Sequence, residues 1–222
     1  MKFLCPESMK RHVQGVFAGQ YDIADLPAPP KVVLDIGANL GSFTVWAARK
    51  WPLATIHAYE PHPDTFAMLD QNVAPLRGPD HTTMLACDIR ISQRAVYADG
   101  ELDFYPGLPN CGCASLWKGE EQRPVPMRVQ GISPTKLPPC DFMMIDTEGS
   151  ELGILLGYPH LDKVTAVALE YHSPRDQRML VAILEDAGLR TQVEAHGRVY
   201  DLAQPPRADR GIIRALREKL AA

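Results

Sequence analysis

The chain has 222 residues, of which 45% are hydrophobic, and it carries a formal net charge of −4. This length and hydrophobic content suit a single domain with one sizeable core. The acidic balance offers no basic face to displace the counterions of a nucleic acid, so we expect no nucleic-acid partner. No apolar run approaches the roughly 20 residues that span a bilayer, so we expect no membrane partner.

The N-terminal part of the sequence predicts a short helical segment rather than a targeting signal. It has no apolar core of signal-peptide length, and the odd number of cysteines, five, favours free thiols, so we expect a cytoplasmic protein. Residues 1–25 are expected to form one or two short helices, and residues 26–30, LPAPP, a stiff connector. We assign residues 1–30 to an N-terminal helical segment and connector within the same domain as residues 31–222.

A strand, a glycine turn and a helix follow the connector. Residues 33–41 read VLDIGANLG, an apolar run with Asp35 near its end and a turn bounded by Gly37 and Gly41. Glycine lets the backbone leave the strand and approach a ligand closely. A dinucleotide fingerprint would have a glycine in place of Asn39. The acidic residue before the turn suits a ligand with a cationic end better than a diphosphate, and S-adenosylmethionine is such a ligand.

A second strand, expected over residues 54–59, ends in an acidic residue. Glu60, which Pro61 follows, lies about 20 positions after Gly41, the usual distance for a carboxylate that accepts hydrogen bonds from both ribose hydroxyls. A strand-end carboxylate by itself would more often cap the following helix, expected over residues 63–73. The two motifs together favour a binding role.

The middle of the chain departs from this alternation. Residues 91–97 and 102–105 flank Asp99 and Gly100, a pair typical of two-residue hairpins, so we expect the third strand to run into an antiparallel hairpin. Residues 74–90 fit no periodicity, and residues 127–132 predict a short strand.

A long loop is expected over residues 106–124, which are rich in Pro, Gly and Cys, and we interpret it as a lid over a pocket. Cys111 and Cys113 in this loop lack the second ligand pair of a structural zinc site, so we assign no metal to them.

The second half returns to strands that alternate with helices. Strands are expected over residues 142–145, 164–169, 191–195 and 211–216, and helices over residues 148–156 and 175–187. This alternation predicts an α/β fold with a mostly parallel, doubly wound sheet and an antiparallel strand near the C-terminus.

Five segments carry a resemblance to a known family. They are VLDIGANLGSF at 33–43, YEPHP at 59–63, AVYADGELDFY at 95–105, DFMMIDTEGSELGILLG at 141–157 and ALEYH at 168–172, and the fourth is the most specific. Through them the chain resembles the FkbM family of S-adenosylmethionine-dependent methyltransferases. The resemblance implies a class I methyltransferase, Rossmann-like fold, with residues 31–222 as the methyltransferase domain. It also implies methyl transfer, usually to a hydroxyl of a small molecule or sugar.

The cofactor is expected beyond the carboxyl ends of the strands, where ligands bind in an open parallel sheet. We expect adenine against Val96, ribose on Glu60, and the methionine ammonium near Asp35, Gly37 and Asp146. The expected cofactor-binding residues are Asp35, Gly37, Asn39, Gly41, Glu60, Pro61, Ala95, Val96 and Asp146.

The reaction also needs a group that takes the proton of the acceptor hydroxyl, since an alcohol is a poor nucleophile. His172 is the natural base, because its ordinary pKa of ~6.5 lets it accept a proton near neutrality. Asp146, Glu148 and Glu170 are the other candidate catalytic residues, and they could instead gather oxygen ligands for a divalent metal such as magnesium. Structural alternatives are a hydrogen-bonded strand-end role for His172 and a helix-capping role for Glu148.

Two other functions compete with an O-methyltransferase that acts on a small-molecule acceptor. One is an NAD-type oxidoreductase on the same kind of sheet, and the other is a cofactor-binding module without activity. Methylation of nucleic-acid amino groups is disfavoured, because residues 146–149 read DTEG rather than an Asn/Asp-Pro-Pro-aromatic turn. The sequence leaves the acceptor and the oligomeric state open. Acceptor choice is expected to lie in residues 1–30 and 106–124.

Overall fold

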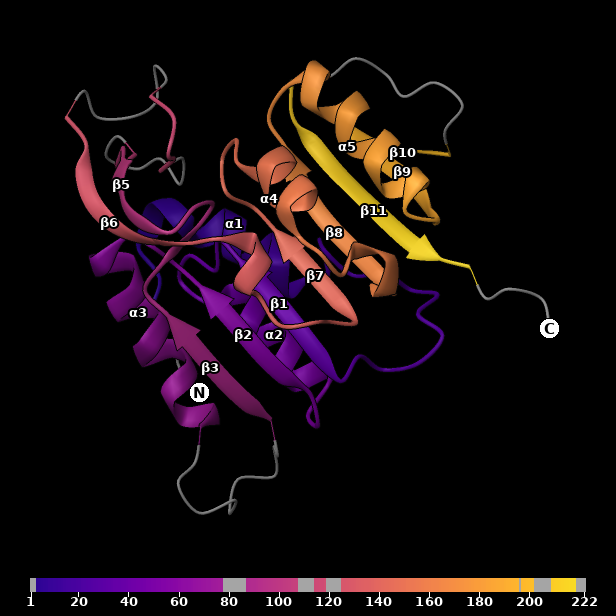
Figure 1. Ribbon diagram of the computed structural model, residues 1–222. Helices are drawn as coiled ribbons and strands as arrows, with labels where there is room; N and C mark the ends of the chain where they lie inside the picture. Colours follow the sequence, from indigo (N-terminus) through magenta and orange to yellow (C-terminus); the bar gives the residue numbers. More distant parts are fainter. Residues whose placement is uncertain are drawn as a thin grey trace.

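A computed structural model describes residues 3–77, 87–107, 114–118, 125–195, 197–201 and 209–218. Its centre is an eight-stranded sheet in the order β10-β9-β11-β8-β7-β1-β2-β3 (Figure 1). The strands are β1 (Val32–Ile36), β2 (Thr55–Tyr59), β3 (Asp88–Ser92), β7 (Phe142–Ile145), β8 (Ala166–Tyr171), β9 (Leu189–Ala195), β10 (Arg198–Asp201) and β11 (Gly211–Arg217).

Strand direction in this sheet agrees with the sequence prediction. The pairs β1–β2, β2–β3, β1–β7 and β7–β8 are parallel. β11 runs antiparallel between β8 and β9, and β10 adds an antiparallel edge strand that the sequence analysis did not predict. The mostly parallel α/β sheet with an antiparallel strand near the C-terminus is therefore confirmed.

Helices cover both faces of the sheet (Figure 1). They are α1 (Lys10–Phe17), α2 (Ser42–Lys50), α3 (Pro63–Val73), α4 (Glu151–Gly157) and α5 (Pro174–Asp186), with short 3₁₀ turns at η1 (Glu7–Met9), η2 (Ala74–Leu76), η3 (Pro134–Lys136) and η4 (Leu161–Lys163). Because side chains alternate along a strand, Val33 of β1 packs with α1, α2 and α3, whereas Leu34 and Ile36 pack with α4 and α5. Each fully buried aliphatic side chain contributes about 1.5–3 kcal/mol, so both faces hold the sheet in place.

A smaller sheet corrects the predicted hairpin. It contains β4 (Ala95–Val96), β5 (Gly100–Phe104) and β6 (Met127–Ile132) in the order β4-β6-β5. β4 and β5 do not pair with each other: Ala95 pairs in parallel with Gly131 on one side of β6, and Gly100 pairs antiparallel with Gly131 on the other. A Cβ at Gly131 would lie 2.1 Å from the carbonyl oxygen of Ala98, so glycine lets the connecting turn cross β6 closely. The chain thus turns at Asp99-Gly100 as expected, but β6 takes the place of the hairpin partner.

Other boundaries differ by a few residues. Helix α4 begins at Glu151 rather than at 148, because residues 146–150 form a turn. The expected N-terminal helices are present as η1 and α1. Cys111 and Cys113 lie outside the described residues, together with most of the predicted lid. Within the described ranges, no helix is both long and apolar enough to cross a membrane.

Candidate functional site

A cavity of about 860 Å³ lies at the carboxyl ends of β1, β2 and β7, between the N-terminal segment and the small sheet. Pro6, Ser8 and Met9 border it from the N-terminal segment, and Phe104 and Met127 border it from the small sheet. Its volume falls in the range of pockets that hold small molecules and cofactors. Of the expected site residues, those that line it are Gly37, Asn39, Glu60, Pro61, Ala95, Val96, Asp146 and Glu148.

The glycine turn after β1 forms one wall of this cavity. Gly37 has φ +84°, and a Cβ there would lie 1.9 Å from the carbonyl oxygen of Asp146. A side chain at Gly37 would therefore both strain the backbone and clash with the neighbouring strand end. Gly41 also has a positive φ, +82°, and precedes α2 as its N-cap residue. It does not line the cavity, and a Cβ at this position would lie 2.6 Å from Leu69 Cδ1, so glycine lets the start of α2 pack closely against α3.

Asp35, which the sequence analysis places near the methionine ammonium, does not line the cavity. Its side chain is fully buried and accepts a hydrogen bond from the Thr44 hydroxyl of α2. Burial raises the pKa of Asp35 to about 7, although the Thr44 hydrogen bond opposes this shift. Because strand residues point alternately to the two faces, Asp35 joins β1 to α2 beneath the turn.

Glu60 occupies the position expected at the end of β2. Its Oε2 accepts a hydrogen bond of 3.0 Å from the Asn39 N–H, and its Oε1 accepts one of 2.8 Å from the His62 N–H. Burial raises its pKa to about 7, and the two backbone hydrogen bonds oppose that effect. A carboxylate has about four acceptor positions, so both oxygens can still accept a hydroxyl donor from the cavity. We call Gly37, Asn39, Glu60 and Pro61, which the sequence analysis expects to bind the cofactor, the cofactor half of the cavity.

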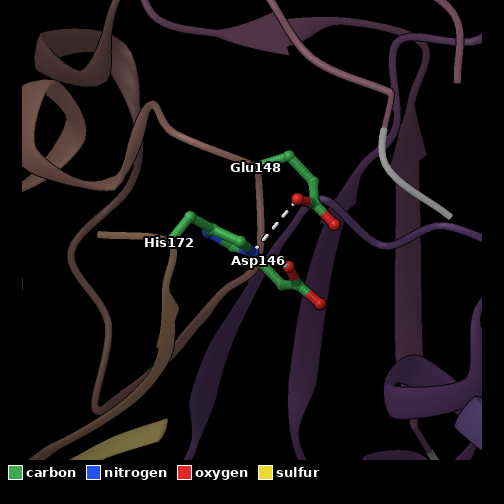
Figure 2. Close-up of side chains that lie close together, drawn as sticks. All are labelled: Asp146, Glu148 and His172. Carbon is green, nitrogen blue, oxygen red and sulfur yellow. Dashed lines mark ion pairs between the residues drawn. The ribbon is translucent and has the colours of Figure 1, made fainter. Parts of the chain in front are cut away.

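A carboxylate–histidine cluster lies at the ends of β7 and β8, and Figure 2 shows its centre. The cluster is formed by Asp146, Glu148, Glu151, Glu170 and His172. The Nε2 atom of His172 lies 3.2 Å from Glu148 Oε2, 3.9 Å from Asp146 Oδ1 and 4.0 Å from Glu170 Oε1. Its Nδ1 atom lies 3.6 Å from Glu151 Oε1. All four catalytic candidates named from the sequence are therefore brought together.

Strand pairing explains how the cluster forms. β7 and β8 are parallel neighbours with Ile145 opposite Leu169, so the acidic residues that follow, Asp146 and Glu170, emerge side by side. The chain then turns sharply, with Glu148 at φ +56°, an uncommon conformation for a residue other than glycine. This turn brings the Glu148 side chain to the cavity. His172, which follows β8, does not line the cavity and contacts Glu148 from behind it.

The charged groups of this cluster shift one another's pKa values. Burial by itself would lower the pKa of His172, but the Glu151, Glu148 and Asp146 carboxylates outweigh it and raise the pKa to about 9. Burial raises the pKa of Asp146 to about 6 and that of Glu170 to about 7, and it also raises that of Glu148. The raised pKa favours the imidazolium form of His172 in the ligand-free protein, whereas the sequence analysis expected a neutral base.

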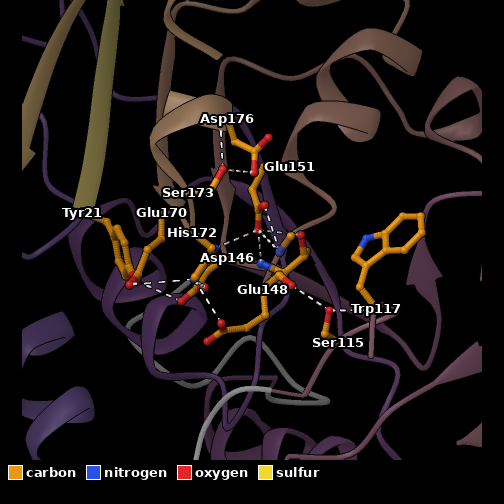
Figure 3. A network of polar contacts seen from close by, with 12 residues as sticks. Tyr21, Ser115, Trp117, Asp146, Glu148, Glu151, Glu170, His172, Ser173 and Asp176 are labelled. Atoms are coloured by element: carbon orange, nitrogen blue, oxygen red, sulfur yellow. Dashed lines mark hydrogen bonds and ion pairs between the residues drawn. The ribbon is translucent and has the colours of Figure 1, made fainter. Parts of the chain in front are cut away.

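Tyr21 is a further member of the site that the sequence analysis missed. Its hydroxyl lies 3.1 Å from both Asp146 Oδ2 and Glu170 Oε2, and the side chain is only 2% exposed (Figure 3). A phenol has one hydrogen to donate, so these two carboxylates share it. Tyr21 lies far from both in sequence, and no local pattern marks it. The N-terminal segment thus contributes directly to the site.

Asp146, Glu148 and His172 also have donor atoms within 4.8 Å of one another, as a metal site would require. His172 Nε2 lies 3.2 Å from Glu148 Oε2, so these side chains also pair with one another.

Comparisons with known proteins agree with this geometry. The family model described as "Methyltransferase FkbM domain" matches residues 35–202. Methyltransferase sdnD of Sordaria araneosa is 28% identical over 76% of each chain. Hexuronic acid methyltransferase AglP of Haloferax volcanii is 26% identical over 77% of this chain and 68% of its own.

Solved structures share the fold. A methyltransferase FkbM from Methylobacillus flagellatus superposes with a TM-score of 0.56 at 14% identity, covering 89% of this chain and 47% of that one. Precorrin-6y C5,15-methyltransferase from Geobacter metallireducens gives 0.54 at 15% identity, covering 98% and 95%. These likenesses establish the α/β fold of class I methyltransferases.

Proposed function

The chain belongs to the FkbM family of methyltransferase domains, and from this premise we propose that it transfers the methyl group of S-adenosylmethionine to a hydroxyl oxygen of a small metabolite or sugar. One relative of this chain is named for a sugar acid, which supports an acceptor of this kind. The cytoplasmic location, the single domain and the absence of a nucleic-acid partner stay predictions from the sequence.

The cofactor half of the cavity fits S-adenosylmethionine. Both oxygens of Glu60 have room for one more hydrogen bond each, which matches the two hydroxyls of a ribose. The Asp146 backbone occupies the position that a side chain at Gly37 would need. At Gly37, therefore, the cavity is bordered by main chain alone. The placement of Glu60 is the observation that carries the proposal. Ala95 and Val96, which line the cavity from β4, are proposed to contact the adenine, and Asp146 the ammonium group.

When bound, the cofactor supplies a methyl group that its sulfonium already activates, so the protein's part is to orient the acceptor and remove its proton. As the acceptor oxygen bonds to the methyl carbon, the bond from that carbon to sulfur breaks and the hydroxyl loses its proton. We assign this proton to Glu148, because it lines the cavity and burial raises its pKa. A carboxylate with a raised pKa is a stronger base, and general-base catalysis contributes typically about 10²–10⁴-fold.

His172, in this proposal, acts through Glu148 rather than as the base itself. Its imidazolium lies 3.2 Å from Glu148 and 3.9 Å from Asp146 and offsets their negative charges. Glu170, which contacts Tyr21, completes the set of acidic groups around it.

The two competing functions predict different binding and turnover. An NAD-type oxidoreductase would bind a dinucleotide, but Asn39 replaces a fingerprint glycine and the family match points elsewhere. A binding module without activity would bind the cofactor and transfer nothing. Family relatives named as methyltransferases favour turnover.

A transfer assay with methyl-labelled S-adenosylmethionine tests the proposal. We expect label on hydroxylated metabolites or sugars, and we expect a chelator to leave the rate unchanged because Glu148 removes the proton. Loss of activity with the chelator, restored by magnesium, would assign proton removal to a metal instead. Cofactor binding without transfer to any acceptor of a broad panel would support the inactive module.

A further inference from the structure

We infer that Glu151 is a positioning residue, which holds the His172 ring from its Nδ1 side so that Nε2 faces Asp146 and Glu148. The inference rests on the proposed function for its catalytic consequence, but the contact itself is structural. Figure 3 shows Glu151 on the opposite side of the His172 ring from Glu148. The two ring nitrogens thus lie between carboxylates, at 3.6 Å from Glu151 and 3.2 Å from Glu148.

The surroundings of Glu151 fix its carboxylate firmly. The side chain is 2% exposed. Its Oε1 accepts hydrogen bonds of 2.9 Å from both the N–H and the hydroxyl of Thr147 and one of 3.1 Å from the Gly149 N–H, and its Oε2 accepts one of 3.0 Å from that same N–H. Burial opposes ionisation of Glu151, but the neighbouring His172 imidazole and, after it, the backbone hydrogen bonds outweigh this effect, so the pKa of Glu151 lies below its ordinary value. Glu151 is thus a buried and fixed negative charge.

The backbone between β7 and α4 is shaped around this carboxylate. Glu148 and Gly149 both have positive φ, +56° and +117°, which directs the Gly149 N–H at Glu151 while the Glu148 side chain turns to the cavity. An uncommon conformation at a residue other than glycine persists only where the surroundings enforce it. One turn therefore places the proposed base and anchors the group that faces His172.

A carboxylate that served only to cap α4 would not need the imidazole. Here Oε1 also lies 3.6 Å from His172 Nδ1, and both ring nitrogens are buried without a complete hydrogen bond to the described part of the chain. An ionised carboxylate on the Nδ1 side attracts the N–H of that nitrogen, which defines the direction in which Nε2 points. The arrangement resembles in logic a triad in which an acid orients a histidine.

Several charged groups surround His172, and each affects its titration. Glu151 faces it from α4, Asp146 and Glu148 from the turn after β7, and Glu170 from β8, while Arg210 acts on Glu148 and His12 on Glu170. Unlike Asp146 and Glu148, Glu151 does not line the cavity. Its removal therefore perturbs His172 without removing a group that contacts the substrate.

The variant Glu151→Gln tests the inference, with the pKa of His172 measured by NMR on the full chain without cofactor. The signal is assigned by its loss in His172→Gln. We expect the His172 pKa to fall by roughly 1–3 units, as for loss of an adjacent opposite charge. The matched control is Glu185→Gln, which removes an exposed carboxylate of α5 and should leave the His172 pKa unchanged. An unchanged pKa in folded Glu151→Gln would overturn the inference.

Thr147 provides a second test should Glu151→Gln fail to fold. Thr147→Val removes one hydrogen bond to Glu151 and keeps the carboxylate, whereas Thr147→Ser keeps the hydroxyl. We expect a smaller fall of the His172 pKa in Thr147→Val and its recovery in Thr147→Ser. Equal His172 pKa values in wild type and Thr147→Val would overturn the inference by this route.

Measurements of kcat then distinguish a positioning role of Glu151 from a purely structural one. In Glu151→Gln we expect kcat to fall at least about 10-fold and its pH profile to shift with the His172 pKa, with cofactor affinity unchanged. An unchanged kcat profile in spite of a shifted His172 pKa would overturn the catalytic part. The NMR result does not depend on methyl transfer, and cofactor calorimetry on the same samples tests the proposed function separately.

Discussion

The cofactor half of the cavity and the carboxylate–histidine cluster both contain buried acids, but they compensate the charge in different ways. In the cofactor half, Glu60 accepts hydrogen bonds from two backbone N–H groups, that of Asn39 in the turn after β1 and that of His62 two residues along the chain. In the cluster, acids from β7, α4 and β8 surround one imidazole and share a tyrosine of the N-terminal segment. The first half is held by backbone donors, whereas the second is held by side chains that compensate one another's charge.

This difference predicts different consequences when each half is altered. Changes in the cofactor half should affect binding of the cofactor and leave the proton chemistry intact. Changes in the cluster at residues other than Asp146, which is proposed to contact the cofactor ammonium, should affect turnover and pH dependence and leave cofactor binding intact.

The largest effect is expected from Gly37→Ala, which should abolish cofactor binding. Its Cβ would lie 1.9 Å from the Asp146 carbonyl oxygen, so the turn must move. Gly100→Ala is the matched control, because Gly100 also has a positive φ, +95°, but a Cβ there meets nothing within 4 Å. For Gly100→Ala, calorimetry should show normal cofactor binding. Thermal unfolding should show that the free energy of unfolding falls by about 1–2 kcal/mol, because alanine is strained at a positive φ. Equal affinities in the two variants would contradict the close backbone approach.

Glu148→Gln should lower kcat by about 10²–10⁴-fold, because the amide cannot take the acceptor's proton. Steady-state kinetics with a saturating acceptor would measure this, and calorimetry should show unchanged cofactor affinity. Glu101→Gln, on the exposed surface of β5, serves as the control. A kcat within a few-fold of wild type would exclude Glu148 as the base.

Glu60→Gln should weaken cofactor binding by about 1.5–3 kcal/mol, the usual contribution of hydrogen bonds to a charged group. At saturating cofactor, kcat should recover, because the cluster is untouched. Calorimetry and kinetics on one preparation would check both. A large fall in kcat at saturation, with affinity preserved, would mean that the two halves are not separable in this way.

The smallest effect concerns stability against pH. The His172 pKa of about 9 exceeds its ordinary value of 6.5, so the folded state binds this proton more tightly than the unfolded chain. That stabilisation is complete below pH 6.5 and is lost as pH rises through 9. Between about pH 7.5 and 9 the free energy of unfolding should fall by about 2 kcal/mol. Denaturant titrations of the wild-type protein should show this fall. If the free energy of unfolding falls by the same amount in His172→Gln, the fall does not come from the titration of His172.

The two halves also differ in how far the sequence could predict them. Gly37, Asn39 and Glu60 follow from local patterns, since strand, turn and strand end occur in order along the chain. Asp35 was expected in the cavity because it precedes the glycine turn, but strand alternation directs it to Thr44. The predicted hairpin was wrong for a related reason, because the pairing partner β6 is distant in sequence.

The cluster could be predicted only in part. Its acids at strand ends were recognised, because parallel neighbouring strands bring their ends together. Tyr21 and Glu151 were missed, since the position of Tyr21 depends on how the N-terminal segment packs and Glu151 looks like an ordinary helix residue. The protonation of His172 depends on both long-range contacts and burial, which no local pattern contains.

Calorimetric titration of the wild-type protein with S-adenosylmethionine tests the central claim most directly, with S-adenosylhomocysteine and NAD as comparisons. The account predicts saturable binding of both S-adenosyl compounds at one site and no binding of NAD. Absence of heat with both S-adenosyl compounds at millimolar concentration, or saturable binding of NAD, would contradict it.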